Sequence, residues 1–182
     1  MTKLLETYFS EVKLIEPELF NDKRGSFFES YNKNVFTSLV GDSVQFVQDN
    51  HSFNTSGVLR GLHYQLDKPQ GKLIRLVSGS ILDVVVDMRQ TSPTFGKHVS
   101  LTIDSLSRRQ LWVPPGFAHG FQVLTKSAEI LYKMTNYWDP SDEHCLLWND
   151  PYLNINWSKK FTPIVSEKDS LGEKFLDCAY FP

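Results

Sequence analysis

The stretch from Arg60 to Gln65 places a guanidinium, an imidazole and an amide within six residues of a β-rich region. Alternate side chains of a strand share a face, so His63 and Gln65 should point the same way. Arg60 has the opposite parity, and it would need a bend at Gly61 to reach the same site. An imidazole titrates near neutral pH, which makes His63 a candidate general base, although a lone histidine is more often a surface or hydrogen-bonded residue.

Four other side chains could act together with this histidine. Tyr132, on a predicted strand, could donate a proton, and Lys72 could stabilise an oxyanion if it lies in a pocket. His119 follows a rigid turn rich in proline and glycine, and Asp169 could orient His63 as the third member of a relay. Each also has an ordinary structural interpretation, such as a core tyrosine, a solvated lysine or a carboxylate that caps a helix.

Arginines and histidines in the sequence are also candidates for phosphate and metal binding. Arg24 and Arg60 could bind phosphates, because a guanidinium suits a bidentate oxyanion. The sequence has no P-loop and no dinucleotide-binding glycine motif, so arginines and aromatic stacking would have to hold a nucleotide. Gln65 stands where small β-barrel metalloenzymes often have a second histidine, which leaves His63 and His119 one ligand short. We therefore expect no catalytic metal.

The composition predicts one domain with a hydrophobic core, spanning residues 1–182. Of the 182 residues, 41% are hydrophobic and 13% aromatic, which suffices for such a core. The net charge of −2 argues against a nucleic-acid partner. Cys145 and Cys178 fit no metal spacing and indicate reduced thiols in a cytoplasmic protein. We expect neither a signal peptide nor a membrane helix, which would need roughly 20 apolar residues.

Short strands separated by turns must position these side chains, and this pattern is typical of an antiparallel sandwich or barrel. The sequence predicts an edge strand over 8–20, a turn over 21–25, a strand over 26–31 and a helix over 33–40 that ends at Gly41. The other predicted strands are 44–47, 58–65, 72–77, 81–88, 99–103, 110–113, 121–123 and 130–134. Near the C-terminus, Ser166-Glu167-Lys168-Asp169 matches the opening of a helix.

The predicted strand 81–88 has the clearest alternation. Its first face carries apolar side chains only, namely Leu82, Val84, Val86 and Met88. Its second face carries Asp83, Val85 and Asp87. These two carboxylates indicate a polar-lined cavity if that face points inward, and only a solvated surface if it points outward.

Several motifs occur in a fixed order along the chain. They are Asp22-x-Arg24-Gly25-x-Phe27-x-Glu29, Gln48-Asp49-Asn50-His51-Ser52, Arg60-Gly61-Leu62-His63-Tyr64-Gln65, Gly71-Lys72-Leu73, Pro115-Gly116-Phe117-Ala118-His119-Gly120 and Trp148-Asn149-Asp150-Pro151. Over about residues 8 to 175 this set resembles the dTDP-4-dehydrorhamnose 3,5-epimerase family of nucleotide-sugar epimerases. The resemblance implies an all-β, cupin-type antiparallel barrel or jelly roll with a few short helices, a homodimer, and neither metal nor cofactor.

The resemblance also implies an isomerase that inverts C3, C5 or both in a nucleoside-diphosphate 4-keto-6-deoxy sugar, through an enolate. The implied catalytic residues are His63 as base, Asp169 as its orienting partner, Tyr132 as acid and Lys72 near the keto oxygen. The implied substrate-binding residues are Arg24, Phe27, Glu29, Gln48, Asp49, Asn50, Arg60, His119, Trp138, Glu143 and Lys168. Arg24 and Glu29 are expected to reach the site from the partner subunit.

Trp138 departs from the family pattern, which usually has a tyrosine that stacks on thymine at this position. Because an indole would also suit a purine, the nucleobase stays open. The alternative substrate is a GDP-linked 4-keto heptose for surface polysaccharide synthesis, with inversion at C3 alone. Two other classes also stay open at this point, a metal-dependent cupin enzyme and a sugar-binding cupin without activity.

Overall fold

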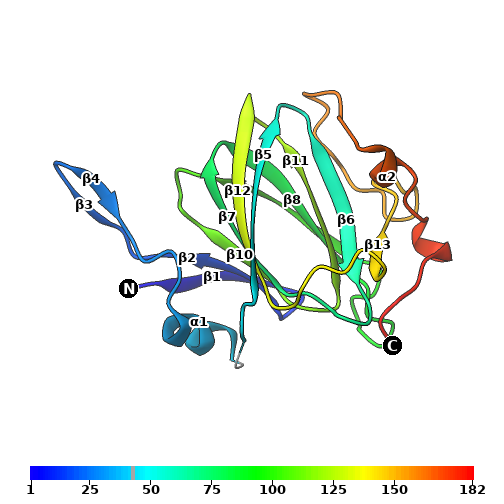
Figure 1. Ribbon diagram of the computed structural model, residues 1–182, viewed down its shortest axis with the longest axis horizontal. Helices are drawn as coiled ribbons and strands as arrows, with labels where there is room; N and C mark the ends of the chain where they lie inside the picture. The colour runs from blue at the N-terminus through cyan, green and yellow to red at the C-terminus, as the bar shows by residue number, and fades with distance from the viewer. Residues whose placement is uncertain (42–43) are drawn as a thin grey trace.

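Two antiparallel sheets form the body of the molecule (Figure 1). The computed structural model describes residues 1–41 and 44–182. The six-stranded sheet has the order β1 (Lys3–Tyr8), β2 (Val12–Glu16), β10 (Gln110–Val113), β7 (Lys72–Ser78), β12 (Ser127–Met134) and β5 (Gln48–Thr55). The five-stranded sheet has the order β13 (Glu143–Cys145), β6 (Leu59–Gln65), β11 (Phe117–Val123), β8 (Ser80–Asp87) and β9 (His98–Asp104). The predicted all-β antiparallel architecture is confirmed.

The inner core lies between the two sheets. Ile74 of β7 and Ile130 of β12 come from the six-stranded sheet, whereas Val85 of β8 and Val123 of β11 come from the five-stranded sheet, and all four are buried in one cluster. Burying side chains of this size contributes about 1.5–3 kcal/mol each. This shared core holds the two sheets together, so the strands that line any cavity between them have fixed relative positions.

Strand β8 shows the predicted alternation and is buried on both faces. Val84 and Val86 pack outward under the C-terminal part of the chain, whereas Val85 packs into the inner core. Asp83 and Asp87 share the inward face with Val85, and both are completely buried. The face that carries these two carboxylates therefore points inward, although neither carboxylate lines the cavity between the sheets.

The C-terminal part of the chain covers the outer face of the five-stranded sheet. Leu146, Trp157 and Phe175 pack there with Leu59 and Val84. Figure 1 shows this part, in orange and red, beside β6 and β13, with the one-turn helix α2 (Glu167–Ser170) and the 3-10 turn η1 (Phe175–Asp177). This cover brings α2 against β6, which carries the candidate base.

Helix α1 (Lys33–Val40) is confirmed with both of its predicted ends. The Asn32 side chain accepts hydrogen bonds from the backbone N–H groups of residues 34 and 35, which are otherwise unpaired at a helix start. Gly41 ends the helix with φ of 88°, a conformation that favours glycine. The helix packs Phe36 edge-on against Trp112, with ring centroids 5.3 Å apart.

Three strand predictions are wrong. The predicted edge strand 8–20 is interrupted by a turn at Phe9 and Ser10, both at positive φ, which separates β1 from β2. The predicted strand 26–31 is shorter, because only β4 (Gly25–Phe27) pairs with β3 (Phe20–Asp22), as a projecting hairpin (Figure 1). The predicted strand 44–47 is not a strand at its described residues. The turn at Phe9 contains no glycine, proline or asparagine, so composition gave no signal there.

Four strands were not predicted: β1 and β3, which share only one residue each with the predicted strand 8–20, as well as β5 and β13. Strand β5 has a polar inward face that includes Gln48 and Asn50, so the apolar alternation used to recognise strands is missing. Strand β13 has only three residues and adds to the edge of β6. Within the described ranges, no helix has the length and apolar character needed to cross a bilayer.

Candidate active site

A cavity of about 310 Å³ opens between the sheets. Three of the four predicted catalytic residues line it: His63 from β6, Lys72 from β7 and Tyr132 from β12. Six of the predicted substrate-binding residues line it as well, namely Gln48, Asn50, Arg60, His119, Trp138 and Glu143. The fold therefore brings residues from Gln48 to Glu143 together around one cavity.

Strand β6 presents both Arg60 and His63 to this cavity because its pairing with β11 is irregular. His63 pairs with His119, and Arg60 pairs with Phe121, so three steps on β6 oppose two on β11. The extra residue reverses the parity of Arg60, as β-bulges do. Gly61 lies in this irregular segment with φ of 106°, which confirms that the expected bend occurs there.

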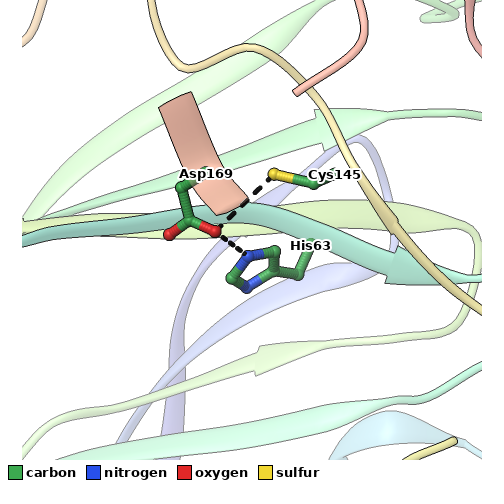
Figure 2. A group of neighbouring side chains, drawn as sticks. All are labelled: His63, Cys145 and Asp169. Carbon is green, nitrogen blue, oxygen red and sulfur yellow. Dashed lines mark hydrogen bonds and ion pairs between the residues drawn. The ribbon is translucent and has the colours of Figure 1, made fainter. Parts of the chain in front are cut away.

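His63 forms a dyad with Asp169, which is the fourth predicted catalytic residue and lies behind the imidazole ring. The His63 Nε2 atom is 2.7 Å from Asp169 Oδ1 (Figure 2). The second carboxylate oxygen accepts the backbone N–H of Gly61 at 3.1 Å. Asp169 is held in the first turn of α2, where its own N–H donates to the Ser166 side chain. The other ring nitrogen, Nδ1, points away from Asp169 (Figure 2) and is free to face a substrate.

Asp169 is buried, yet it carries a negative charge that suits this role. Burial alone would raise the pKa of its carboxyl group. The hydrogen bond and charge of His63, together with the bonds from Gly61 and Ser166, outweigh burial and lower that pKa below its usual value. An ionised Asp169 fixes the proton of His63 on Nε2, so Nδ1 keeps its lone pair and can accept a proton.

Lys72 lines the cavity and is buried. Its ammonium group donates to the carbonyl oxygen of His63 at 3.2 Å. Burial lowers the pKa of Lys72 to about 8, although the negative charges of Glu143 and Asp83 partly oppose this shift. Near neutral pH it is therefore a poorly solvated cation, which interacts strongly with any oxyanion placed beside it.

Tyr132 enters the cavity from the six-stranded sheet, whereas His63 enters it from the five-stranded sheet. Tyr132 is half-buried, packs against the inner core and pairs with Asn50 of β5 and Ile74 of β7. A central strand with partners on both sides holds its ring in place. The cavity therefore has a candidate base on one sheet and a candidate acid on the other.

His119 is a second buried histidine with a carboxylate partner. Its Nε2 atom lies 2.9 Å from Asp83 Oδ2. The other oxygen of Asp83 is buried without a hydrogen-bond partner among the residues that the structure describes. Because His63 and His119 each direct Nε2 at a different carboxylate, they do not converge on one point as a pair of metal ligands would.

The mouth of the cavity carries hydrogen-bonding groups around an exposed indole. Gln48 donates to Asn50 at 2.8 Å and accepts the backbone N–H of Trp138 at 3.0 Å. The Trp138 side chain is 53% exposed, so its ring is available for stacking. Arg60 donates to Asn54 at 2.7 Å, which holds the guanidinium at the rim.

Glu143 and Lys168 form an ion pair at the same rim. Burial would raise the pKa of Glu143, but the Lys168 ammonium and the nearby His63 lower it below its usual value. Lys168 is exposed and does not line the cavity itself. Its predicted contact with substrate therefore requires the side chain to leave Glu143 or to bind at the outer edge.

Four predicted substrate-binding residues lie away from the cavity of their own chain. Arg24 and Phe27 belong to the β3–β4 hairpin and are exposed, with Arg24 bonded to Asp22. Glu29 follows the hairpin and accepts a hydrogen bond from the Asn32 side chain. Asp49 alternates with the inward side chains of β5, so it points outward and pairs with Lys133 at 3.0 Å. The prediction that Asp49 contacts substrate in its own chain is not supported by this geometry.

Two residues near the site were missed as functional candidates. Gln65 is buried, accepts the backbone N–H of Asp139 and donates to the carbonyl oxygen of Tyr137, so it holds the loop that carries Trp138. The sequence signal for Gln65 was its position two residues after His63, which places both side chains on the same face of a strand. Cys145 lies 3.8 Å from Asp169 Oδ1, and no spacing in the sequence indicated that contact.

Comparison with known proteins gives consistent matches over almost the whole chain. Residues 6–177 match the family model described as dTDP-4-dehydrorhamnose 3,5-epimerase. A protein of that name from Pseudomonas aeruginosa is 52% identical over 172 residues, which cover 94% of this chain and 95% of that protein. A second protein of that name, from Shigella flexneri, is 50% identical and covers 98% of both chains.

A solved structure agrees with these matches. It is dTDP-6-deoxy-D-glucose-3,5-epimerase from Legionella pneumophila in complex with dTDP-4-keto-L-rhamnose. That structure is similar to this chain with a TM-score of 0.95 and 40% sequence identity, covering 98% of this chain and 95% of the other.

Proposed function

The chain belongs to the dTDP-4-dehydrorhamnose 3,5-epimerase family, and from this premise we propose that it inverts C3 and C5 of a dTDP-linked 4-keto-6-deoxy sugar. It is an isomerase of the epimerase class. The observation that carries the proposal is the shared cavity that His63 and Tyr132 enter from opposite sheets and that Lys72 also lines.

His63 is the base in this proposal. The ketone at C4 acidifies the hydrogens on C3 and C5, and Nδ1 of His63 removes one of them. Asp169 then stabilises the imidazolium, because its ionised carboxylate lies 2.7 Å from the opposite ring nitrogen. The buried position of Asp169 strengthens this interaction, since a low-dielectric surrounding screens the charges little.

Lys72 stabilises the enolate oxygen that forms at C4. It supplies a buried positive charge in the wall of the cavity, fixed by its bond to the His63 carbonyl oxygen. A preorganised charge of this kind typically contributes several kcal/mol to the transition state, about 2.7–4 kcal/mol per donor in other enzymes. The carbonyl of the substrate supplies the acidity, so the reaction requires no redox cofactor.

Tyr132 returns the proton from the other face of the ring. A proton removed by His63 on one face and supplied by Tyr132 on the other inverts the carbon between them. The two carbons that flank the ketone can undergo the same sequence in turn. One cavity with one base and one acid therefore suffices for inversion at both centres.

The nucleotide part of the substrate binds at the mouth of the cavity. Trp138 offers an exposed ring for stacking, and Arg60 offers a guanidinium for a phosphate. The matched relatives are named for dTDP-linked substrates, which favours thymine on Trp138. The GDP-linked 4-keto heptose remains the second candidate, because the indole is larger than the tyrosine usual at this position.

We also propose that the working unit is a homodimer. The β3–β4 hairpin projects from the body of the molecule (Figure 1) with Phe20 and Phe27 exposed by 54% and 67%. Arg24 lies at the turn of this hairpin and Glu29 follows it, so the hairpin could place both beside the cavity of the partner subunit. We place the enzyme in the cytoplasm, because Cys145 and Cys178 are both free thiols.

Solvent deuterium exchange tests the proposed function. The protein is incubated in D₂O with dTDP- or GDP-linked 4-keto sugars, and deuterium at C3 and C5 is followed by NMR. We expect exchange at both carbons with the dTDP sugar, no exchange with His63→Ala, and initial exchange that exceeds inversion with Tyr132→Phe. A His63→Ala variant that exchanges at the wild-type rate would refute the assignment of the base. Exchange at C3 alone in the wild type would mean that the enzyme inverts only that carbon.

A further inference from the structure

Three potential metal ligands from three separate elements meet behind the cavity. His63 of β6, Cys145 of β13 and Asp169 of α2 each offer one donor atom, and all three donor atoms lie within 4.8 Å of one another. Figure 2 shows the carboxylate between the imidazole and the thiol. We propose that these residues form an inhibitory site for a thiophilic divalent cation such as Zn²⁺.

The donor set suits zinc. Zinc binds cysteine sulfur, histidine nitrogen and carboxylate oxygen at about 2.0–2.3 Å, so neighbouring donors of a tetrahedral site lie roughly 3–4 Å apart. Here Asp169 Oδ1 lies 2.7 Å from His63 Nε2 and 3.8 Å from Cys145 Sγ. Small side-chain shifts would place all three around one ion, with the fourth position left for water.

The surroundings hold the carboxylate in a suitable orientation. Asp169 Oδ2 accepts the backbone N–H of Gly61 at 3.1 Å, which leaves Oδ1 for the cation. Second partners of this kind orient metal ligands in established sites. Burial raises the pKa of the Cys145 thiol to about 12, so a cation must displace a tightly held proton. We therefore expect weaker binding than at a structural zinc site, as suits a reversible inhibitor.

A cation bound at this site would change the tautomer of His63 and so stop proton abstraction from the sugar. In the active form the proton is on Nε2, facing Asp169, and Nδ1 is the base. A neutral imidazole has a single N–H proton, so a cation can bind the Nε2 lone pair only in the other tautomer, in which that proton has moved through solvent from Nε2 to Nδ1. That nitrogen can then no longer accept a proton from the sugar. The inhibition rests on the proposed role of His63, whereas binding of the cation does not.

Inhibition is tested with the full-length protein after treatment with EDTA. ZnCl₂ is titrated into the deuterium-exchange assay, and EDTA is added afterwards. We expect inhibition that EDTA reverses, and Cys145→Ser should raise the half-inhibiting zinc concentration about tenfold or more. Cys178→Ser is the matched control, because it removes the other thiol but leaves the site intact, so its sensitivity should equal that of the wild type.

Cobalt absorption tests the binding without any reference to activity. Titration of CoCl₂ should produce a thiolate-to-cobalt charge-transfer band in the wild type and in Cys178→Ser, but not in Cys145→Ser or His63→Ala. Equal zinc sensitivity of the wild type and Cys145→Ser, or the absence of the band from the wild type, would refute the site. If the wild type shows the cobalt band but catalyses no deuterium exchange, the cation site stands and the proposed function is refuted.

Discussion

The two nitrogens of His63 have different surroundings, and this difference underlies the roles that we propose for them. Nε2 faces the ionised Asp169, which fixes the tautomer, and Nδ1 is left for the substrate. Histidine is suited to both tasks because its pKa allows it to change charge near neutral pH. The same arrangement explains why a cation behind the ring would inhibit, since it competes for the nitrogen that holds the proton in place.

The lowered pKa of Lys72 predicts the pH above which the activity should fall. Its burial lowers its pKa to about 8, so it is charged below that pH and neutral above it. Stabilisation of an enolate requires the charged form, and we expect kcat/KM, which reports the pKa values of the free enzyme, to fall as the pH rises through about 8. The measurement is the pH dependence of kcat/KM in the wild type between pH 6 and about 10.

Two substitutions separate this effect from other titrations. In Lys72→Arg the guanidinium stays charged throughout this range, so any remaining activity should lose its alkaline limit. In Lys72→Met the charge is absent at every pH, and activity should fall by about 10²–10³. An alkaline limit that persists unchanged in Lys72→Arg would mean that another group is responsible.

At the scale of elements, the irregular pairing of β6 with β11 positions the site. It turns Arg60 and His63 to the same side, and it brings the two backbones very close at Gly61. A Cβ atom on Gly61 would lie 2.6 Å from the carbonyl oxygen of His119 and 2.7 Å from Cα of Gly120. No side chain can adjust to relieve this contact, because both neighbouring atoms belong to the backbone.

The substitution Gly61→Ala should therefore damage both stability and activity. It combines an unfavourable positive φ with a backbone clash, and we expect a loss of about 3 kcal/mol or more in the free energy of unfolding. Urea unfolding measures this loss. Gly41→Ala is the matched control, because Gly41 also has positive φ but a Cβ there would meet no atom of the described residues, 1–41 and 44–182, within 4 Å. The control should lose only about 1 kcal/mol, and equal losses would show that the close approach of β6 to β11 is unimportant.

At the scale of the whole molecule, the proposed homodimer would bring the exposed hairpin of one subunit to the cavity of the other. Arg24 and Phe27 lie outside the cavity of their own chain, and the hairpin that carries them projects away from the sheets (Figure 1). An isologous dimer would exchange two such hairpins across its two-fold axis. Each site would then depend on residues from both chains.

Mixing subunits of two impaired variants tests whether each hairpin completes the site of its partner. His63→Ala should be inactive, and Arg24→Ala should lose at least about tenfold in kcat/KM, because a charge-assisted hydrogen bond to substrate is removed. After the two are unfolded together and refolded, half of the dimers are mixed and each has one intact site, so roughly a quarter of the wild-type activity should return. A mixture that only averages the two parent activities would place Arg24 outside the partner's site.

Local patterns in the sequence determined much of this protein. Gly41 predicted the end of α1, and Ser166 predicted the start of α2, because caps act through hydrogen bonds to nearby residues. Alternation predicted β8 and placed its two carboxylates on one face, while the direction of that face stayed open. The ordered motifs indicated the family and the candidate base, acid and lysine. These features were readable because each depends on residue type and short spacing.

The tertiary structure decided which of these residues meet. Asp169 contacts His63 across 106 positions, and Cys145 joins them only because β13 adds to the edge of β6. The polar face of β5 concealed that strand, and only its place beside β12 shows why Gln48 points inward and Asp49 outward. Such contacts depend on sheet order and on one shift in strand register. Both are set by the packing of distant segments, which no local pattern contains.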